Sequence, residues 1–108
     1  MRRARADLVC GERAAWAFDL LGRRWTVAIL ATLARRPARF SELARAVPGM
    51  SERVMNERLQ DLVEAGLVER RVTSGPPLTA TYALAETGQR LAPALRRLVA
   101  WAESLPER

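Results

Sequence analysis

Apolar residues recur at helical spacing along the first third of the chain. Residues 8–21 form a predicted helix whose apolar face consists of Ala14, Ala17, Phe18 and Leu21. Gly22 ends this helix, and a second helix follows with a single apolar stripe of Trp25, Ile29 and Leu33. Pro37 stops the second helix, because proline has no backbone N–H to continue the hydrogen-bond ladder.

Two shorter helical segments lie on either side of a predicted tight turn at Pro48-Gly49. The first spans residues 40–47 and directs inward Phe40, Leu43, Ala44 and Val47. The second spans residues 52–65 and has on its core side Met55, Leu59 and Leu62. Ser51 is suited to cap the N-terminus of the second helix, and Gly66 is suited to the position after its C-terminus.

From residue 68 the pattern alternates with a period of two. Residues 68–73 and 79–84 form two predicted strands, and the turn between them contains Ser74, Gly75, Pro76 and Pro77. We therefore expect a two-stranded hairpin. Residues 86–105 are helical again, with apolar positions at Leu91, Leu95, Leu98, Val99 and Trp101. Pro93 lies inside this segment, so we expect a kink or a restart of the helix there.

The order of these elements predicts a mostly α-helical fold with a small β-hairpin, in the α+β class. A helix-turn-helix followed by a hairpin wing is a DNA-binding architecture, in which the second helix enters the major groove and the hairpin touches the backbone. We expect one such winged domain over residues 8–105, with the wing at about 68–84 and the last helix at about 86–105. Residues 1–7 form a basic arm with Arg2, Arg3 and Arg5, which either attracts DNA non-specifically, reaches a minor groove or has no role.

The charge supports nucleic acid as the partner. The 108 residues include 18 basic and 12 acidic ones, which gives a net charge of +6. Every basic residue is an arginine, whose planar, permanently charged group suits phosphate. A small basic domain of this kind favours double-stranded DNA over a membrane surface. Apolar runs are too short for a membrane span or a signal-peptide core, so we expect a cytoplasmic protein.

The composition leaves little chemistry for catalysis. The chain has no histidine and one cysteine, which excludes the usual structural zinc site and a disulfide within the chain. Ser-His and Cys-His nucleophilic pairs are excluded for the same reason. The glycines are scattered and form no phosphate-binding loop. We therefore expect no enzyme activity, no metal site and no cofactor.

The predicted helix at 52–65 carries polar side chains away from its core stripe, and these are Glu52, Arg53, Asn56, Glu57 and Gln60. They form either a solvated face or the surface that contacts bases and phosphates. Arg53 suits the O6 and N7 atoms of guanine, and Asn56 suits an adenine edge. Glu57 either accepts from a cytosine amine or repels wrong registers. Arg58 lies nearer the flank, where it is expected to pair with its own helix.

Further DNA contacts are expected beside this helix. Arg39 either clamps a phosphate or pairs with Glu42. Arg70 and Arg71 point to opposite faces of one strand, so only one can meet DNA and the other is expected to pair with an acid. The remaining candidates are hydroxyl side chains, which donate to phosphates or act as caps: Ser41, Ser51, Thr73 and Thr79.

Several blocks of this sequence, in order and at the right spacing, resemble the HxlR family of bacterial winged-helix regulators. The first two blocks are residues 22–26 with Ile29 and Leu30, and residues 39–43. The next two match the recognition helix, the wing and the start of the last helix, at Ser51, Leu59, Leu62, Gly66, Leu67, Val68, Arg70, Pro77, Tyr82, Leu84 and Gly88. Trp101 matches a tryptophan near the family's end. The resemblance extends from about Cys10 to Trp101.

The resemblance implies a homodimeric transcription factor, here expected to be a repressor on a palindromic operator. The first and last helices would form the dimer interface, for which the candidates are Trp16, Leu20, Leu95, Leu98 and Trp101. Trp16 either anchors this interface or lines a small-molecule pocket. The alternative function is a winged-helix module that binds proteins and reads no DNA sequence.

Some members of the family sense oxidants or electrophiles through a cysteine before the first helix. Cys10 is the corresponding candidate, and nearby Arg13 favours its thiolate; the alternative is a passive buried thiol. In a homodimer, two copies of Cys10 could form a disulfide. The sequence departs from the family at Ala85, where a threonine usually caps the last helix, so either Thr87 caps a shorter helix or the end frays. Thr79 and Ala80 replace a basic and a β-branched residue on the wing.

Overall fold

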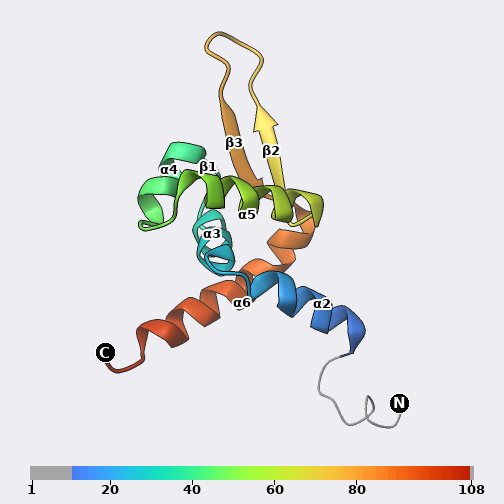
Figure 1. Ribbon diagram of the computed structural model, residues 1–108, viewed down its shortest axis with the longest axis vertical. Coiled ribbons are helices and arrows are strands. Elements are labelled where there is room, and N and C mark those ends of the chain that lie inside the picture. Colours follow the sequence, from blue (N-terminus) through green and yellow to red (C-terminus); the bar gives the residue numbers. More distant parts are fainter. Residues whose placement is uncertain (1–10, 108) are drawn as a thin grey trace.

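The computed structural model describes residues 11–107 of the protein, and helices make up most of this part of the chain (Figure 1). The predicted fold class, mostly helical with a small antiparallel sheet, is confirmed. The elements follow in the order α2 (Glu12–Leu21), α3 (Thr26–Leu33), β1 (Ala38–Arg39), α4 (Phe40–Ala46), α5 (Glu52–Glu64), β2 (Val68–Val72), β3 (Ala80–Leu84) and α6 (Glu86–Glu103).

Helix α3 lies at the centre of the fold and contacts α2, α4, α6 and β3. It is apolar nearly all round, which is typical of a buried helix. Ile29 and Leu30 are fully buried, and Leu33 is nearly so. Trp25 precedes this helix and is half-buried, with a left-handed φ of 79°. A left-handed conformation is uncommon for a bulky residue, so packing must hold Trp25 in place.

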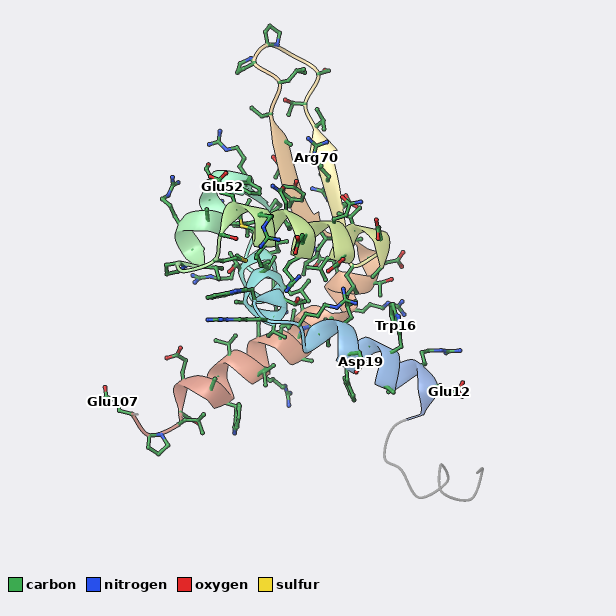
Figure 2. The ribbon with its side chains drawn as sticks, viewed as in Figure 1. Glu12, Trp16, Asp19, Glu52, Arg70 and Glu107 are labelled. Atoms are coloured by element: carbon green, nitrogen blue, oxygen red, sulfur yellow. The ribbon has the colours of Figure 1, made fainter. Side chains whose placement is uncertain are left out.

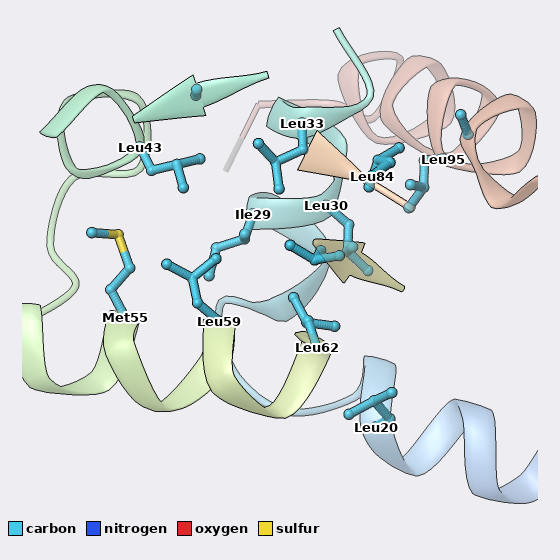
Figure 3. Close-up of a cluster of buried hydrophobic side chains, with 13 residues drawn as sticks. Leu20, Ile29, Leu30, Leu33, Leu43, Met55, Leu59, Leu62, Leu84 and Leu95 are labelled. Carbon is cyan, nitrogen blue, oxygen red and sulfur yellow. The ribbon is translucent and has the colours of Figure 1, made fainter. Parts of the chain in front are cut away.

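The core gathers side chains from every helix and from the three strands (Figure 3). Burying one leucine of this kind stabilises the fold by about 1.5–3 kcal/mol. The predicted core positions of α5 and the inward positions Leu43 and Val47 are confirmed as buried. The buried cluster consists of Leu20, Ile29, Leu30, Leu33, Ala38, Leu43, Met55, Leu59, Leu62, Val68, Leu84, Ala92 and Leu95.

Two helices bury less of their apolar surface than their periodicity predicts. In α2 the predicted inward residue Phe18 is 60% exposed, and Leu20 is buried instead. The reason is visible in Figure 1, where α2 points away from the body and meets it only near its C-terminal end. The second half of α6 likewise runs past the body, which leaves exposed Leu98, Val99 and Trp101.

The sheet has three strands, in the order β1-β3-β2, where the sequence predicts a two-stranded hairpin. Strand β2 pairs with β3 over five residue pairs from Val68–Leu84 to Val72–Ala80. The added strand, β1, has only two residues, and its Arg39 pairs with Thr81. So short a strand leaves no alternating pattern in the sequence, which is why the prediction missed it.

Helix α6 begins at Glu86, which excludes the expected shorter helix capped by Thr87. Ala85 occupies the N-cap position without a side-chain cap, and its N–H donates instead to the carbonyl oxygen of Leu67 at 2.9 Å. Of the two alternatives expected at Pro93, a kink or a restart, the restart is excluded, because α6 continues through Pro93 to Glu103. Among residues 11–107, no helix has both the length and the apolar character to cross a membrane.

Candidate nucleic-acid interface

Helices α4 and α5 form the predicted helix-turn-helix. At the start of α4, the Arg39 N–H donates to Glu42 Oε1 at 2.8 Å. This hydrogen bond lowers the pKa of the Glu42 carboxyl below its ordinary value, and three neighbouring guanidinium groups add to the effect. The turn to α5 passes through Gly49, whose φ of +96° favours glycine. A Cβ there would lie 3.4 Å from the Trp25 ring, so the turn packs closely on the residue that precedes α3.

Helix α5 has both of its predicted end signals. The Ser51 Oγ accepts a hydrogen bond from the Val54 N–H at 3.1 Å, so this hydroxyl acts as the expected N-cap. At the other end, Gly66 has a φ of +82°, and the Leu67 N–H donates to the Leu62 carbonyl at 3.0 Å. This is the Schellman arrangement that glycine favours. Both ends of the helix are therefore defined by local sequence.

The outer face of α5 is exposed, as predicted, and consists of Glu52, Arg53, Asn56, Glu57 and Gln60. Two pairs within the helix organise it: Arg53 Nη1 lies 2.8 Å from Glu57 Oε2, and Gln60 Nε2 donates to Glu64 at 2.9 Å. The whole helix contains four acidic residues and two arginines, so its own charge is negative. Positive charge for a nucleic acid must come from the elements around it.

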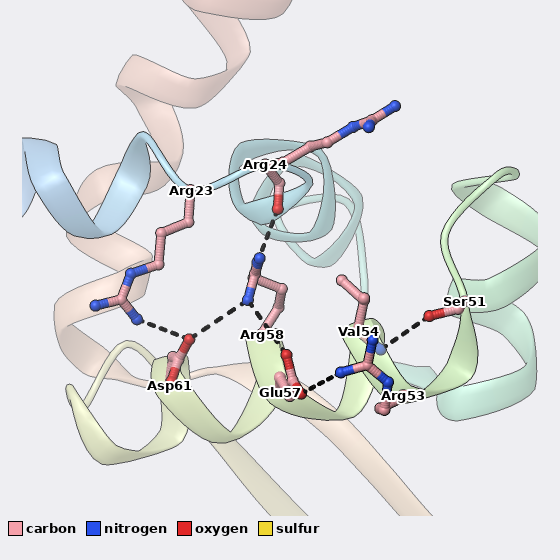
Figure 4. Close-up of polar contacts among 8 residues, drawn as sticks. All are labelled: Arg23, Arg24, Ser51, Arg53, Val54, Glu57, Arg58 and Asp61. Atoms are coloured by element: carbon pink, nitrogen blue, oxygen red, sulfur yellow. Dashed lines mark hydrogen bonds and ion pairs between the residues drawn. The ribbon is translucent and has the colours of Figure 1, made fainter.

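The flank of α5 is tied to the turn between α2 and α3 (Figure 4). Arg58 Nε donates to the carbonyl oxygen of Arg24 at 2.9 Å, and Arg23 Nη1 lies 2.7 Å from Asp61 Oδ2. Arg58 also lies 3.9 Å from the carboxylates of Glu57 and Asp61, which confirms that it pairs along its own helix. The bond to Arg24 spans 34 residues of sequence, so no local pattern indicated it.

Strands β1 and β2 carry three exposed arginines, which are Arg39, Arg70 and Arg71. Arg71 Nε lies 2.6 Å from Glu69 Oε1, which confirms that one arginine of the adjacent pair binds an acid. Arg70 projects from β2 near the wing, on the same half of the molecule as Glu52 (Figure 2). The Arg39 side chain is exposed on β1, and the ion pair that forms at Glu42 comes from Arg36, at 3.6 Å. In the described part of the chain, Arg39 and Arg70 are thus the strand arginines whose side chains form no ion pair.

The two wing threonines have a structural role. The Oγ1 atoms of Thr73 and Thr79 lie 2.8 Å apart, and the Thr79 N–H donates to Thr73 Oγ1 at 3.1 Å. The Thr73 N–H donates to the Thr79 carbonyl at 2.9 Å. These contacts close the base of the wing loop and leave each hydroxyl with less capacity for a phosphate. The segment 73–80 carries no charge, and its Leu78 is 72% exposed.

The candidates for a dimer interface separate into two groups. Leu20 and Leu95 are 6% and 3% exposed and belong to the core of the single chain, so their assignment to an interface is wrong. The exposed candidates are Trp16, Leu98 and Trp101. Trp16 also borders a hollow between α2 and α5, so both expectations for it, interface anchor and pocket residue, stay open.

Other predicted positions are placed as follows. Ser41 is exposed near the start of α4. The arginines of the arm and Cys10 lie outside the described residues. Within residues 11–107, no cluster of three or more acidic, cysteine or histidine side chains has a geometry that would hold a metal ion.

Comparison with known proteins agrees with this geometry. Residues 20–108 match the model of the HxlR-like helix-turn-helix family. The chain is 36% identical over 91 residues to the HTH-type transcriptional regulator YodB of Bacillus subtilis, covering 84% of this chain and 81% of that protein. It is 40% identical over 86 residues to the regulator YvaP of the same organism, covering 80% of each.

Solved structures lead to the same group. The reduced form of YodB from B. subtilis superposes with a TM-score of 0.78 at 34% identity, covering 93% of this chain and 97% of that one. The quinone-bound form of YodB has a TM-score of 0.74 at 32% identity, covering 89% of this chain and all of that one. The chain therefore belongs to the HxlR-like helix-turn-helix family of transcriptional regulators.

Proposed function

We propose that this transcriptional regulator binds a palindromic operator as a homodimer and acts as a repressor in the bacterial cytoplasm. The observation that carries the proposal is the outer face of α5, which is exposed and polar, together with the exposed Arg39 on β1 and Arg70 on β2. An exposed helix with this layout fits the major groove, and arginines at its sides fit the phosphates. Residues 8–105 would act as one domain, with the basic arm at 1–7 adding non-specific attraction.

We assign different roles to the proposed DNA-binding residues, and the contacts described above support this division. Arg53, Asn56, Glu57 and Gln60 face outward from the middle of α5 and are assigned to base edges, with Glu52 at the edge of the groove. Arg39, Ser41 and Arg70 are assigned to phosphates. The remaining candidates support the interface through the cap, the ion pair and the wing closure described above: Ser51, Arg71, Thr73 and Thr79.

Exposed apolar side chains support the homodimer. Large apolar residues lie open to solvent on α2, on the outer half of α6 and just after it, at Trp16, Phe18, Leu98, Val99, Trp101 and Leu105. The two helices extend from the body in different directions (Figure 1), and exposed apolar surface of this kind on each of them is typical of an interaction site. A two-fold pairing through these helices would present two copies of α5 to half-sites about 34 Å apart.

An oxidant or another electrophile is the proposed effector. Structures of the relative YodB are known after diamide treatment and with bound quinone. Cys10 is the only thiol in this chain, so it is the proposed point of attack.

Fluorescence anisotropy tests the proposal directly. The probe is the duplex upstream of the protein's own gene, compared with a scrambled duplex of equal length at two salt concentrations. We expect a specificity ratio of about 10³ or more near physiological salt. Equal, salt-sensitive binding to both duplexes, repeated with a pool of random sequences, would support the alternative of a protein-interaction module.

A further inference from the structure

The inference concerns the Arg53–Glu57 ion pair at the centre of the outer face of α5. Arg53 Nη1 lies 2.8 Å from Glu57 Oε2, and the two side chains are 77% and 51% exposed. An exposed pair one helical turn apart contributes little to stability. Its significance lies in what it presents to a ligand, namely a guanidinium held by a carboxylate in the middle of a surface that would face DNA.

The charge around this pair opposes non-specific binding. The other arginine of α5, Arg58, is turned to the flank, where it binds the Arg24 carbonyl. Arg53 is therefore the cation of the outer face, and Glu57 neutralises it. A carboxylate near a phosphate backbone is repelled, so α5 gains little from the sequence-independent attraction that dominates non-specific binding. Duplex DNA must instead offer partners to both side chains.

A G·C base pair offers those partners. In the major groove guanine presents two adjacent acceptors, O6 and N7, and cytosine presents the N4 amino donor beside them. Arg53 has five donors, so it can bind both guanine atoms and keep one N–H on Glu57. Glu57 holds Arg53 with Oε2. Its Oε1 lies 3.9 Å from Arg58 Nη1, too far for a hydrogen bond, so this oxygen can still accept from cytosine N4. An A·T pair presents acceptor, donor, acceptor in that order, and does not match.

We propose that Arg53 and Glu57 act as one unit that selects a G·C pair in each half-site, with Glu57 as the specificity-determining residue. This inference rests on the proposed function. At a wrong base pair Glu57 faces an acceptor and stays unsatisfied, which rejects the site. At the correct pair it holds the Arg53 guanidinium over the base edge. Without Glu57, the long and exposed Arg53 side chain turns to the nearest phosphate.

The test compares the wild type with Glu57→Ala, in selection of binding sites from a pool of randomised duplexes. Glu107→Ala is the control, because it removes the same charge at the far end of the molecule (Figure 2). We expect the wild type and the control to enrich a palindrome with a fixed G·C pair in each half-site. In Glu57→Ala that position becomes degenerate. Circular dichroism checks that each variant keeps its helical content, which we expect because the substituted side chains are exposed.

Anisotropy titrations then give the magnitude. For Glu57→Ala, affinity for a random-sequence duplex should rise about tenfold, and the ratio of operator to random affinity should fall by about tenfold or more. The salt dependence on the random duplex should steepen by about two ions per dimer, one for each copy of Arg53 that joins the phosphate contacts. An unchanged ratio, or a wild-type motif without the fixed G·C pair, overturns the inference. If the wild type enriches no motif at all, the proposed function itself fails.

Discussion

A methyl group added at Gly88 should destabilise the fold, although the same change stabilises an ordinary helix. Gly88 lies in the first turn of α6 and is buried. A Cβ built there collides with the carbonyl oxygen of Leu67 and approaches Leu84 Cδ2 at 3.2 Å. That carbonyl also accepts the hydrogen bond from Ala85 that starts α6. Gly88→Ala must therefore push α6 away from the turn between α5 and β2.

The magnitude follows from three contributions. Overpacking of a core contact of this kind costs about 1–3 kcal/mol. Loss or distortion of the Ala85 to Leu67 hydrogen bond adds about 0.5–1.5 kcal/mol. Alanine in place of glycine within a helix stabilises the helix by about 1 kcal/mol, which offsets part of this loss. We expect Gly88→Ala to lower the free energy of unfolding by about 2 kcal/mol.

Urea unfolding followed by circular dichroism measures this change, at one chain concentration because a dimer's stability depends on it. The midpoint should fall with an unchanged slope. Gly75→Ala is the matched control: nothing lies within 4 Å of its added Cβ, so we expect a change within about 0.5 kcal/mol. A Gly88→Ala protein as stable as the wild type, or more stable, would refute the steric argument.

Three further predictions concern the helix cap, the wing and the assembly. The lowered pKa of Glu42 means that its bond to Arg39 stabilises α4 above pH about 4.3 and that this contribution is lost as pH falls through the folded-state pKa. On acidification, the midpoint temperature of thermal unfolding should therefore decline less for Glu42→Gln than for the wild type. Parallel curves of this temperature against pH would contradict the prediction. Arg70→Ala should reduce the salt slope of DNA binding by about two per dimer, one for each copy, and Arg71→Ala, whose partner is an acid, should reduce it less. Equal slopes for the two variants would show that the ion pair with Glu69 does not keep Arg71 from phosphate. Trp101→Glu should halve the mass seen by light scattering while the helical content stays the same, and an unchanged mass would place the interface elsewhere.

The positions that depend on local sequence were predicted correctly. Ser51 and Gly66 bound α5 as expected, because capping involves only neighbouring residues. The buried stripe of Met55, Leu59 and Leu62 follows from helical periodicity alone. The outer face of α5 was identified for the same reason, since it is what remains once the core stripe is assigned.

The errors arise where tertiary packing decides. Periodicity shows that a helix has an apolar face but not how far along the helix a neighbour extends, so Phe18 was placed inside and Leu20 at an interface. Strand β1 depends on β3, more than forty residues later in the chain. The bond from Arg58 to Arg24 joins two polar positions that carry no mutual pattern. For the site, the sequence indicates which residues face outward but not which of them are already paired.

The contacts of Arg58 and Asp61 with the turn between α2 and α3 have a geometric consequence for the operator. They join α5 to the turn that follows α2, the helix through which two copies would meet. In the proposed homodimer, these contacts would set the separation of the two α5 helices. DNA turns once in about 10–10.5 base pairs, so one base pair inserted between half-sites rotates one of them by about a tenth of a turn. Tolerance of spacing would then have to come from bending of the DNA, which makes the stiffness of the uncontacted central base pairs part of what the protein recognises.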